Sequence, residues 1–213
     1  MQNKDEFLKK LKLKQEKIIA NVSDPVTNKK IKFNVVNDVT LYRAQTLFTK
    51  EPITINWIRN FKKNSTFFDI GANVGIYSIY AALSRSVNVY SFEPESSNFH
   101  ILMENIIINN LNNFIIPFPL GISNKTELTK LQLSLFQTGQ SHHTVGENLL
   151  DHTTLEAISN NFFQGIFSTT LDELCFKWNL PIPSYLKIDV DGIESKIIEE
   201  AKNTLLNPIL ESL

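Results

Sequence analysis

The chain has 213 residues, of which 42% are hydrophobic and 20% charged, and its formal net charge is −1. These values are typical of one globular domain and exclude a collagen-like or wholly disordered chain. Basic and acidic residues nearly balance, at 21 and 22, so nothing indicates a nucleic-acid-binding surface. No apolar run approaches the roughly 18 residues that a membrane span needs. The single cysteine, Cys175, excludes an intrachain disulfide and a cysteine-cluster zinc site, and a reducing, cytoplasmic compartment is expected.

We interpret residues 1–63 as an N-terminal helical extension and lead-in. Residues 4–20 favour an amphipathic helix, with Phe7, Leu11 and Ile18 near one face and lysines over much of the rest. A solvated helix that packs on the domain is expected, and contact with a membrane surface or an anionic polymer is the alternative. The segment lacks the apolar region and cleavage site of a signal peptide. A further helix is expected over residues 53–61.

Strands and helices are expected to alternate from residue 64 to the C-terminus. The expected strands are residues 66–70, 87–92, 114–119 and 185–190, with 131–136 as a strand of an insertion. The expected helices are residues 76–83, 96–109, 170–178 and 193–205. Strand–helix–strand repetition predicts parallel pairing, right-handed crossovers and helices on both faces. The fold class is therefore α/β, with an open, doubly wound and mostly parallel sheet over residues 64–213.

A glycine turn follows the first strand of this domain. Gly71 and Gly75 allow a backbone geometry and a close approach that a Cβ would block. In doubly wound sheets ligands bind beyond the carboxyl ends of the strands. A dinucleotide motif would need glycine at positions 73 and 76, which hold Asn73 and Ile76, and no P-loop Gly-Lys-Ser/Thr follows. The turn therefore favours a nucleoside ligand without a pyrophosphate.

A glutamate stands at the end of the second strand of the domain. Glu93 follows Gly71 by about 20 positions, the distance at which a carboxylate accepts hydrogen bonds from ribose hydroxyls. A glycine turn alone is common, and so is a glutamate at the end of a strand. Together, within one strand–helix–strand unit, they predict a nucleoside site.

Three segments in order resemble the FkbM-type S-adenosylmethionine-dependent methyltransferases. They are residues 68–75 (FDIGANVG), 92–94 (FEP) and 186–194 (LKIDVDGIE), and residues 170–174 (TLDEL) also fit. The resemblance extends from about residue 51 to the C-terminus. It implies the Rossmann-like class I methyltransferase fold, S-adenosyl-L-methionine as the cofactor, and methyl transfer to an oxygen. Acceptors in this family are often hydroxyls of sugars or other small molecules.

The resemblance also implies roles for individual residues. Asp189 and Asp191 match the motif beside the site of methyl transfer. Residues 121–123, after the third strand, lie where the adenine would be flanked. The implied cofactor-binding residues are Asp69, Gly71, Asn73, Gly75, Glu93 and Ser123.

A hydroxyl acceptor must lose its proton, so the reaction calls for a base. Asp189 and Asp191 could accept the proton, hold the acceptor, or face the positive end of the cofactor. Lys187 alternates with Asp189 along the strand, so both are expected to point the same way, with Lys187 as a charged partner of the acids. His142 and His143 lie in the insertion, either as acceptor-site residues or as exposed loop histidines. Asp189, Asp191 and His143 form the candidate catalytic set.

Two other functions remain open at this point. Asp189 and Asp191 have the D-x-D form of metal-dependent nucleotide-sugar glycosyltransferases, in which carboxylates hold a divalent ion. That hypothesis leaves the glycine turn and Glu93 unexplained. The second alternative is a non-catalytic binding subunit with a methyltransferase fold. For the methyltransferase, no metal is expected.

The last six residues, 208–213, lie at or inside the expected fifth strand, whereas the family normally continues through more sheet. The C-terminal strands are therefore expected to be missing. An unpaired edge exposes N–H and C=O groups, so we expect possible self-association through the C-terminal edge of the sheet.

Overall fold

The computed structural model describes residues 17–133, 138–139, 143–145 and 162–213. These residues form a two-stranded sheet and two four-stranded sheets. No helix among them has both the length and the apolar character that crossing a membrane requires.

The central sheet is parallel, in the order β10-β3-β4-β5. Its strands are β3 (Thr66–Ile70), β4 (Asn88–Phe92), β5 (Ile115–Phe118) and β10 (Tyr185–Ile188). All four lie within the ranges predicted from sequence. The expected α/β class with a mostly parallel sheet is confirmed.

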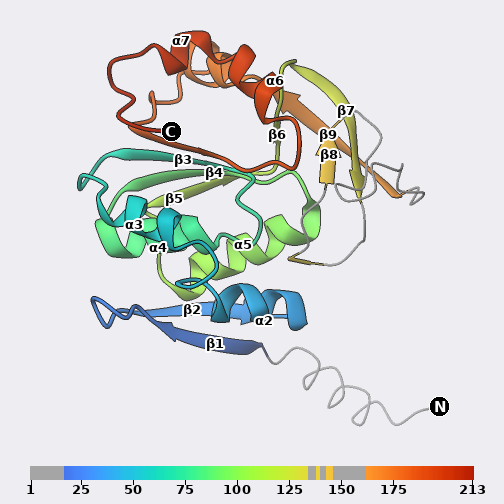
Figure 1. The fold of residues 1–213 in the computed structure, drawn as a ribbon. Helices are drawn as coiled ribbons and strands as arrows, with labels where there is room; N and C mark the ends of the chain where they lie inside the picture. The colour runs from blue at the N-terminus through green and yellow to red at the C-terminus, as the bar shows by residue number, and fades with distance from the viewer. Residues whose placement is uncertain (1–16, 134–137, 140–142, 146–161) are drawn as a thin grey trace, which may run out of the picture.

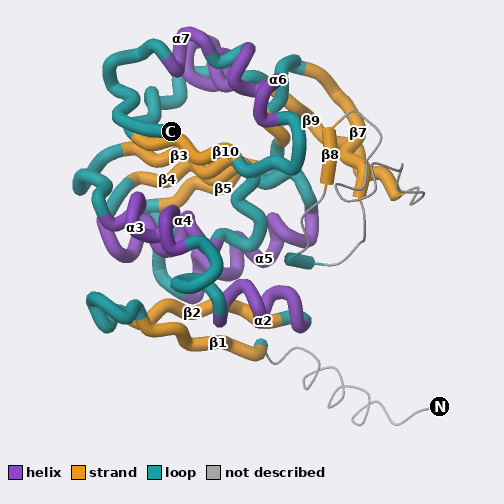
Figure 2. The backbone as a smooth tube through the Cα atoms, in the orientation of Figure 1, coloured by secondary structure: helices purple, strands orange, loops and turns teal. Residues whose placement is uncertain are grey.

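Helices cover both faces of this sheet (Figures 1 and 2). One face carries α3 (Pro52–Arg59), α4 (Ile76–Arg85) and α5 (Ser96–Ile108). The other carries the π-helix η1 (Glu173–Lys177), α6 (Glu194–Glu199) and α7 (Lys202–Leu205). Because side chains alternate along a strand, Phe67 joins the apolar core under α4 and α5, while Phe68 joins the core on the opposite face. Both rings are fully buried, as a sheet covered on two faces requires.

The lead-in forms a hairpin and a helix beneath α5 (Figure 1). The strands β1 (Ile18–Ser23) and β2 (Lys30–Val35) pair antiparallel, and α2 (Asp38–Gln45) follows. The helix expected over residues 4–20 is therefore wrong for residues 18–20, which lie in β1. Its remainder falls mainly in residues 1–16, outside the described part of the chain.

Asn105 of α5 ties the hairpin to the glycine turn. Its Oδ1 accepts a hydrogen bond from the backbone N–H of Asn34 in β2, at 2.7 Å. Its Nδ2 donates to the carbonyl of Val74, at 2.8 Å. Because Asn105 is fully buried, both bonds replace water contacts that it could not otherwise make. The lead-in is thus attached to the turn that borders the ligand edge.

A second sheet lies beside the carboxyl end of the central one, in the order β6-β9-β7-β8 (Figure 1). Its strands are β6 (Gly121–Ile122), β7 (Glu127–Leu133), β8 (His143–Val145) and β9 (Phe162–Thr169). The strand expected over residues 131–136 falls at the end of β7, and residues 134–136 lie outside the described residues.

The helix expected over residues 193–205 is divided into α6 and α7. Asp172 accounts for the second start, because its Oδ1 accepts from the backbone N–H of Thr204 at 2.8 Å and its Oδ2 from that of Asn203 at 3.0 Å. These bonds satisfy N–H groups that the first turn of a helix leaves without partners.

The C-terminal residues run beside β10, where the fifth strand was expected. Ser212 forms a parallel bridge with Tyr185 and accepts a hydrogen bond from the N–H of Leu186 at 3.1 Å. Self-association through this edge stays a prediction.

Candidate functional site

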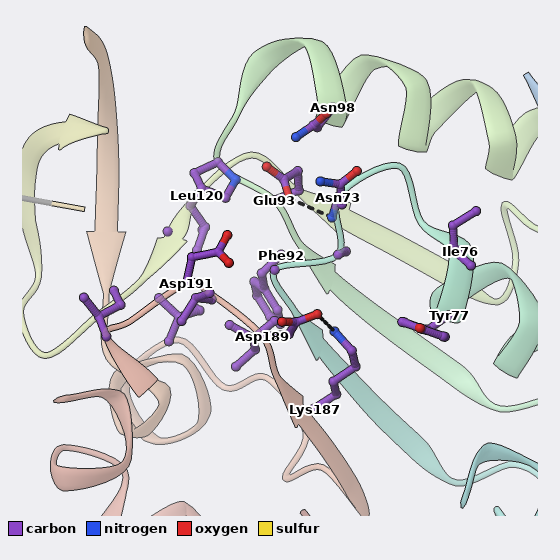
Figure 3. A pocket seen from close by; sticks show the side chains of 18 of the residues that line it. Asn73, Ile76, Tyr77, Phe92, Glu93, Asn98, Leu120, Lys187, Asp189 and Asp191 are labelled. Carbon is purple, nitrogen blue, oxygen red and sulfur yellow. Dashed lines mark hydrogen bonds and ion pairs between the residues drawn. The ribbon is translucent and has the colours of Figure 1, made fainter. Parts of the chain in front are cut away.

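A cavity of about 350 Å³ opens at the carboxyl ends of β3, β4 and β10 (Figure 3). This is the edge at which parallel α/β sheets bind ligands, and the volume suits a small organic molecule. Several segments that are far apart in the sequence form its wall: residues 70–73, 92–94, 120–122 and 189–191, with Arg43, Lys50 and Glu51 of the lead-in.

Gly71 brings the ends of β3 and β10 together. Its φ is +76°, and a Cβ at this position would lie 1.9 Å from the carbonyl oxygen of Asp189. No side chain fits such a contact, so glycine is required on both grounds. Gly71 thus lines the cavity and also allows the backbone of Asp189 to lie against the turn.

Gly75 has a packing role that differs from the expected cofactor contact. It is absent from the cavity wall and precedes α4 with a φ of +85°. A Cβ there would lie 2.4 Å from Cδ1 of Leu102 in α5. Gly75 therefore allows α4 and α5 to pack closely, and a contact of this residue with the cofactor stays a prediction.

Glu93 is a buried carboxylate on the wall, with 5% of the residue exposed. Its Oε2 accepts from the backbone N–H of Asn73 at 2.7 Å, and its Oε1 from that of Glu95 at 2.9 Å. Burial raises the pKa of Glu93 to about 7, although both N–H donors act in the opposite direction. A carboxylate has about four acceptor positions, and these two donors together with the Asn98 side chain leave about one for a ribose hydroxyl.

Asn98, in the first turn of α5, supports Glu93 and was not predicted from sequence. Its side chain hydrogen-bonds the Glu93 carboxylate, and its Oδ1 accepts from the N–H of Gly139 at 2.6 Å. Figure 3 shows Asn98 beside Glu93 and Asn73. Its position just after the Glu93 strand end was the available signal. A polar residue in the first turn of the next helix lies at the same edge of the sheet.

Lys187 joins two acids at the end of β10. Its Nζ lies 3.0 Å from Oδ2 of Asp189 and 3.5 Å from Oδ1 of Asp69. It also lies 5.3 Å from the centre of the Tyr77 ring, within range of a cation–π contact. Burial lowers the pKa of Lys187, but the two carboxylates outweigh it and raise the pKa overall, so Lys187 is a cation. The prediction that Lys187 and Asp189 point the same way is confirmed.

Asp69 lies beneath the cavity rather than on its wall. It is fully buried, and its Oδ2 accepts from the hydroxyl of Ser78 at 2.6 Å. It is not among the residues that line the cavity, and the cofactor-binding role implied by the resemblance stays a prediction. Its contact with the site is the ion pair with Lys187.

Asp189 and Asp191 both line the cavity, as expected (Figure 3). The side chain of Asp189 is 58% exposed, which places its carboxylate on the open side of the site. Asp191 adopts a left-handed conformation, with φ +55°. Such backbone conformations are uncommon outside glycine and cluster at functional sites.

Tyr77 and Glu51 form a further part of the wall that sequence reasoning missed. The Tyr77 hydroxyl donates a hydrogen bond to Glu51, and burial together with this acid raises the pKa of Tyr77. Tyr77 is therefore a neutral hydrogen-bonding group in this site. Tyr77 stands next to the glycine turn, which was a usable signal, whereas nothing in the sequence links Glu51 to the turn.

The remaining predicted residues lie away from the wall or cannot be placed on it. Ser123 is absent from it, and its N–H bonds the carbonyl of Thr169 at 2.9 Å, which joins β6 to β9. Leu120, Gly121 and Ile122 line the cavity instead. His143 lies in β8, opposite Leu133, and His142 lies outside the described residues. A role for either histidine stays a prediction.

Comparison with known proteins identifies the family. Residues 69–212 match the methyltransferase FkbM domain, which is more than half of the chain. The chain belongs to the FkbM methyltransferase domain family. The fold is accordingly that of the class I methyltransferases. The cofactor of this FkbM domain is S-adenosylmethionine.

One curated relative is the hexuronic acid methyltransferase AglP of Haloferax volcanii. It is 23% identical over 174 residues, which cover 82% of this chain and 65% of that protein. The chain thus spans somewhat less than two thirds of the length of this relative.

Among solved structures, a precorrin-6y C5,15-methyltransferase from Geobacter metallireducens gives a TM-score of 0.43 at 13% identity, covering 76% of this chain and 60% of that one. The M. jannaschii TYW2 structure in complex with AdoMet gives 0.35 at 23% identity, covering 48% and 43%. Both scores are below 0.5, so the family assignment rests on the domain match.

The residues that line the cavity fit S-adenosylmethionine. A buried carboxylate faces a space of nucleoside size, beside a turn that carries no phosphate-binding lysine. Glu93 would hold the ribose, and Gly71 and Asn73 would border the ligand. Within the described residues, no group of three or more His, Cys, Asp and Glu side chains could hold a metal ion.

Proposed function

We propose that this chain transfers a methyl group from S-adenosylmethionine to a hydroxyl of a sugar. The observation that carries the proposal is a single cavity that contains a buried ribose-type acid, Glu93, and two further carboxylates, Asp189 and Asp191. The FkbM domain match supports the reaction class. The similarity to a hexuronic acid methyltransferase supports a sugar as the acceptor.

The protein mainly binds and positions in such a reaction. S-adenosylmethionine, when bound, supplies a methyl group that its sulfonium already activates. Glu93 would hold the ribose by accepting a hydrogen bond from a hydroxyl, and the Asn73 and Glu95 N–H groups fix the orientation of its carboxylate. Correct orientation of two reactants can lower a barrier by roughly 7–11 kcal/mol, so this positioning is the largest contribution expected.

Asp189 and Asp191 act on the acceptor. They hold its hydroxyl by hydrogen bonds, and one of them takes the proton. Lys187 fixes the Asp189 side chain at 3.0 Å, so this carboxylate is held in one orientation. A positioned base contributes typically about 10²–10⁴-fold to the rate.

The same ion pair disfavours the glycosyltransferase alternative. A divalent ion on the D-x-D segment would need the Asp189 carboxylate, which already binds the Lys187 ammonium. Bringing a divalent cation to that oxygen would set two positive charges against each other. The family match and Glu93 are explained by methyl transfer and not by this alternative.

The test is transfer of labelled methyl from S-adenosylmethionine to a panel of glycosides, including methyl β-glucuronide and methyl β-glucoside. The Asp189→Asn and Asp191→Asn variants should retain nucleoside binding and lose turnover, with one of them about 10²-fold slower or more. Lys63→Gln, an exposed change before β3 at the opposite edge of the sheet, serves as the control. Turnover unaffected in both aspartate variants would contradict the assigned roles. If no glycoside of the panel is methylated, the proposed sugar acceptor is contradicted.

A further inference from the structure

Arg43 reaches the cavity from outside the matched family domain. It lies on α2 and lines the wall, whereas the FkbM match begins only at residue 69. The residue is partly buried, and its Nε donates a hydrogen bond to the carbonyl of Gly139. The guanidinium is therefore held in place by one of its nitrogens.

The other two cations of the wall already have carboxylate partners. Lys187 pairs with Asp189 at 3.0 Å, and Lys50 lies 3.8 Å from Glu51. For Arg43, no carboxylate of the described residues lies within ion-pair distance. Burial lowers the pKa of Arg43, and the negative charges of Asp189, Glu93 and Asp191 oppose this change from farther away. Because arginine is always protonated in proteins, the site holds a partly desolvated cation without a close counter-charge.

We propose that Arg43 binds a carboxylate group of a ligand in this cavity. With Nε engaged by Gly139, the two terminal nitrogens are the groups available to a ligand. A guanidinium matches a carboxylate with two parallel hydrogen bonds, which a lysine cannot reproduce. Partial burial removes water from the Arg43 guanidinium. A ligand carboxylate would replace those hydrogen bonds and supply the missing counter-charge.

Two ligands of the proposed function carry such a group, and this inference rests on that function. One is the cofactor, through its methionine carboxylate. The other is an acidic sugar acceptor of the uronic acid class. The chemistry at Arg43 is the same in both cases, so the experiment must separate the two sources.

The fixed backbone of Gly139 supports a built position for Arg43. Gly139 has φ +87°, and a Cβ there would lie 3.1 Å from the Thr40 side chain of α2. Its N–H donates to Asn98, the residue that hydrogen-bonds Glu93. The carbonyl that orients Arg43 is thus fixed between α2 and the expected ribose site.

The first arm of the test uses the cofactor side. Calorimetry would compare S-adenosylhomocysteine with 5′-methylthioadenosine, which lacks the amino acid part, in the native protein and in Arg43→Gln. If the cofactor carboxylate binds Arg43, affinity for S-adenosylhomocysteine falls about 10- to 100-fold while that for 5′-methylthioadenosine is unchanged.

The second arm uses the acceptor side. Binding of methyl β-glucuronide and methyl β-glucoside to protein saturated with S-adenosylhomocysteine would be measured by ligand-observed NMR. If the acceptor carboxylate binds Arg43, Arg43→Gln weakens the glucuronide selectively, by a factor in the same range.

Arg43→Lys and Lys63→Gln complete the design. Arg43→Lys keeps the charge but loses the paired hydrogen bonds, so it should restore only part of the selectivity, and it serves if Arg43→Gln fails to fold. Lys63→Gln removes one positive charge far from the cavity and should change neither arm. An equal loss for S-adenosylhomocysteine and 5′-methylthioadenosine, or no selective loss in either arm, would overturn the proposal. Neither arm needs methyl transfer, so a failure of the proposed sugar methylation would be seen separately.

Discussion

Protonation of Glu93 should control binding of the nucleoside part of the cofactor. Its carboxylate is the buried acid of the cavity, and burial raises its pKa to about 7. Ribose hydroxyls donate hydrogen bonds to an ionised carboxylate, whereas a protonated carboxyl offers fewer acceptor positions. Nucleoside binding is therefore expected to require the ionised form of Glu93. Below pH 7, where Glu93 is mostly protonated in the free protein, binding should release a proton.

The size of the effect follows from the pKa. If only the ionised form binds, affinity is nearly constant above pH 8 and falls toward tenfold per pH unit below 7. At pH 6 about one molecule in eleven would carry the ionised group, so binding should be about tenfold weaker than at pH 8. Substituting Glu93 by glutamine removes hydrogen bonds to a charged acceptor and should cost about 1.5–3 kcal/mol at pH 8.

Calorimetry with 5′-methylthioadenosine is the suitable assay, because this ligand has no ionisable group between pH 5 and 8. Titrations at pH 6, 7 and 8, in buffers of different ionisation enthalpy, would count the protons released. Glu93→Gln should bind weakly and without pH dependence. An affinity for the native protein that stays constant from pH 6 to 8, with no proton released, would refute the reasoning.

The same group affects the stability of the unliganded protein. Its pKa rises from 4.5 in the unfolded chain to about 7 in the folded protein, so the folded state binds more protons between these values. The free energy of unfolding should therefore decrease as pH rises from about 4.5 to 7. Thermal melting of the native protein and of Glu93→Gln would isolate this contribution, because the variant lacks the titrating group.

The other predictions concern packing, charge, metal and the insertion. Gly75→Val should destabilise the fold by about 1–3 kcal/mol or more through its contact with Leu102 and its positive φ, in urea denaturation, with nucleoside affinity of the folded protein retained. Lys187→Met leaves the buried Asp69 without its cation and should cost about 3–5 kcal/mol, much of it recovered by adding Asp69→Asn; no recovery in the double variant would contradict the pairing. Methyl transfer should persist in EDTA, and a loss that magnesium or manganese restores would disprove this. His143→Ala should slow turnover without weakening 5′-methylthioadenosine, and full turnover would remove the histidine from the site.

The strands of the central sheet were predictable because burial on both faces imposes a simple pattern. Residues 66–70 and 185–190 are short runs of mostly apolar residues bounded by turn-forming residues, which is typical of parallel strands. The second sheet gave a weaker signal. Strand β7 begins with Glu127 and exposes Leu128, and its buried residues lie only in its last part. The apolar pattern therefore indicated only the part of this strand from Leu131 onward.

The division of the C-terminal helix depended on a residue that is distant in sequence. Ile193, Ile197 and Ala201 are spaced as on one helix, and all three are buried. The break comes from Asp172, whose carboxylate supplies the start of α7. A tertiary contact thus overrode a local pattern that was correct about which residues face the core.

The site was predictable where it follows strand ends. Glu93, Asp189 and Asp191 could be placed together because the carboxyl ends of parallel strands meet at one edge. Arg43 could not, because it reaches the cavity only once the hairpin and α2 have folded against the domain, where Asn105 of α5 binds β2. Glu51 could not, because it precedes α3 and its position depends on the packing of α3 against α4. For Gly75, sequence established that glycine was needed but not which contact required it.

The register between β3 and β10 explains how two distant motifs form one charge cluster. In this parallel pair Leu186 lies opposite Phe68, and Lys187 lies opposite Asp69. Leu186 and Phe68 belong to the core on the α6 side, which leaves Lys187 and Asp69 on the α4 side beside Tyr77. A slip by one residue would turn Lys187 into that apolar core and move Leu186 to the α4 side beside Asp69, so the side-chain pattern fixes the register. The ion pairs of Lys187 with Asp69 and Asp189 therefore follow from apolar packing on the opposite face of the same strands.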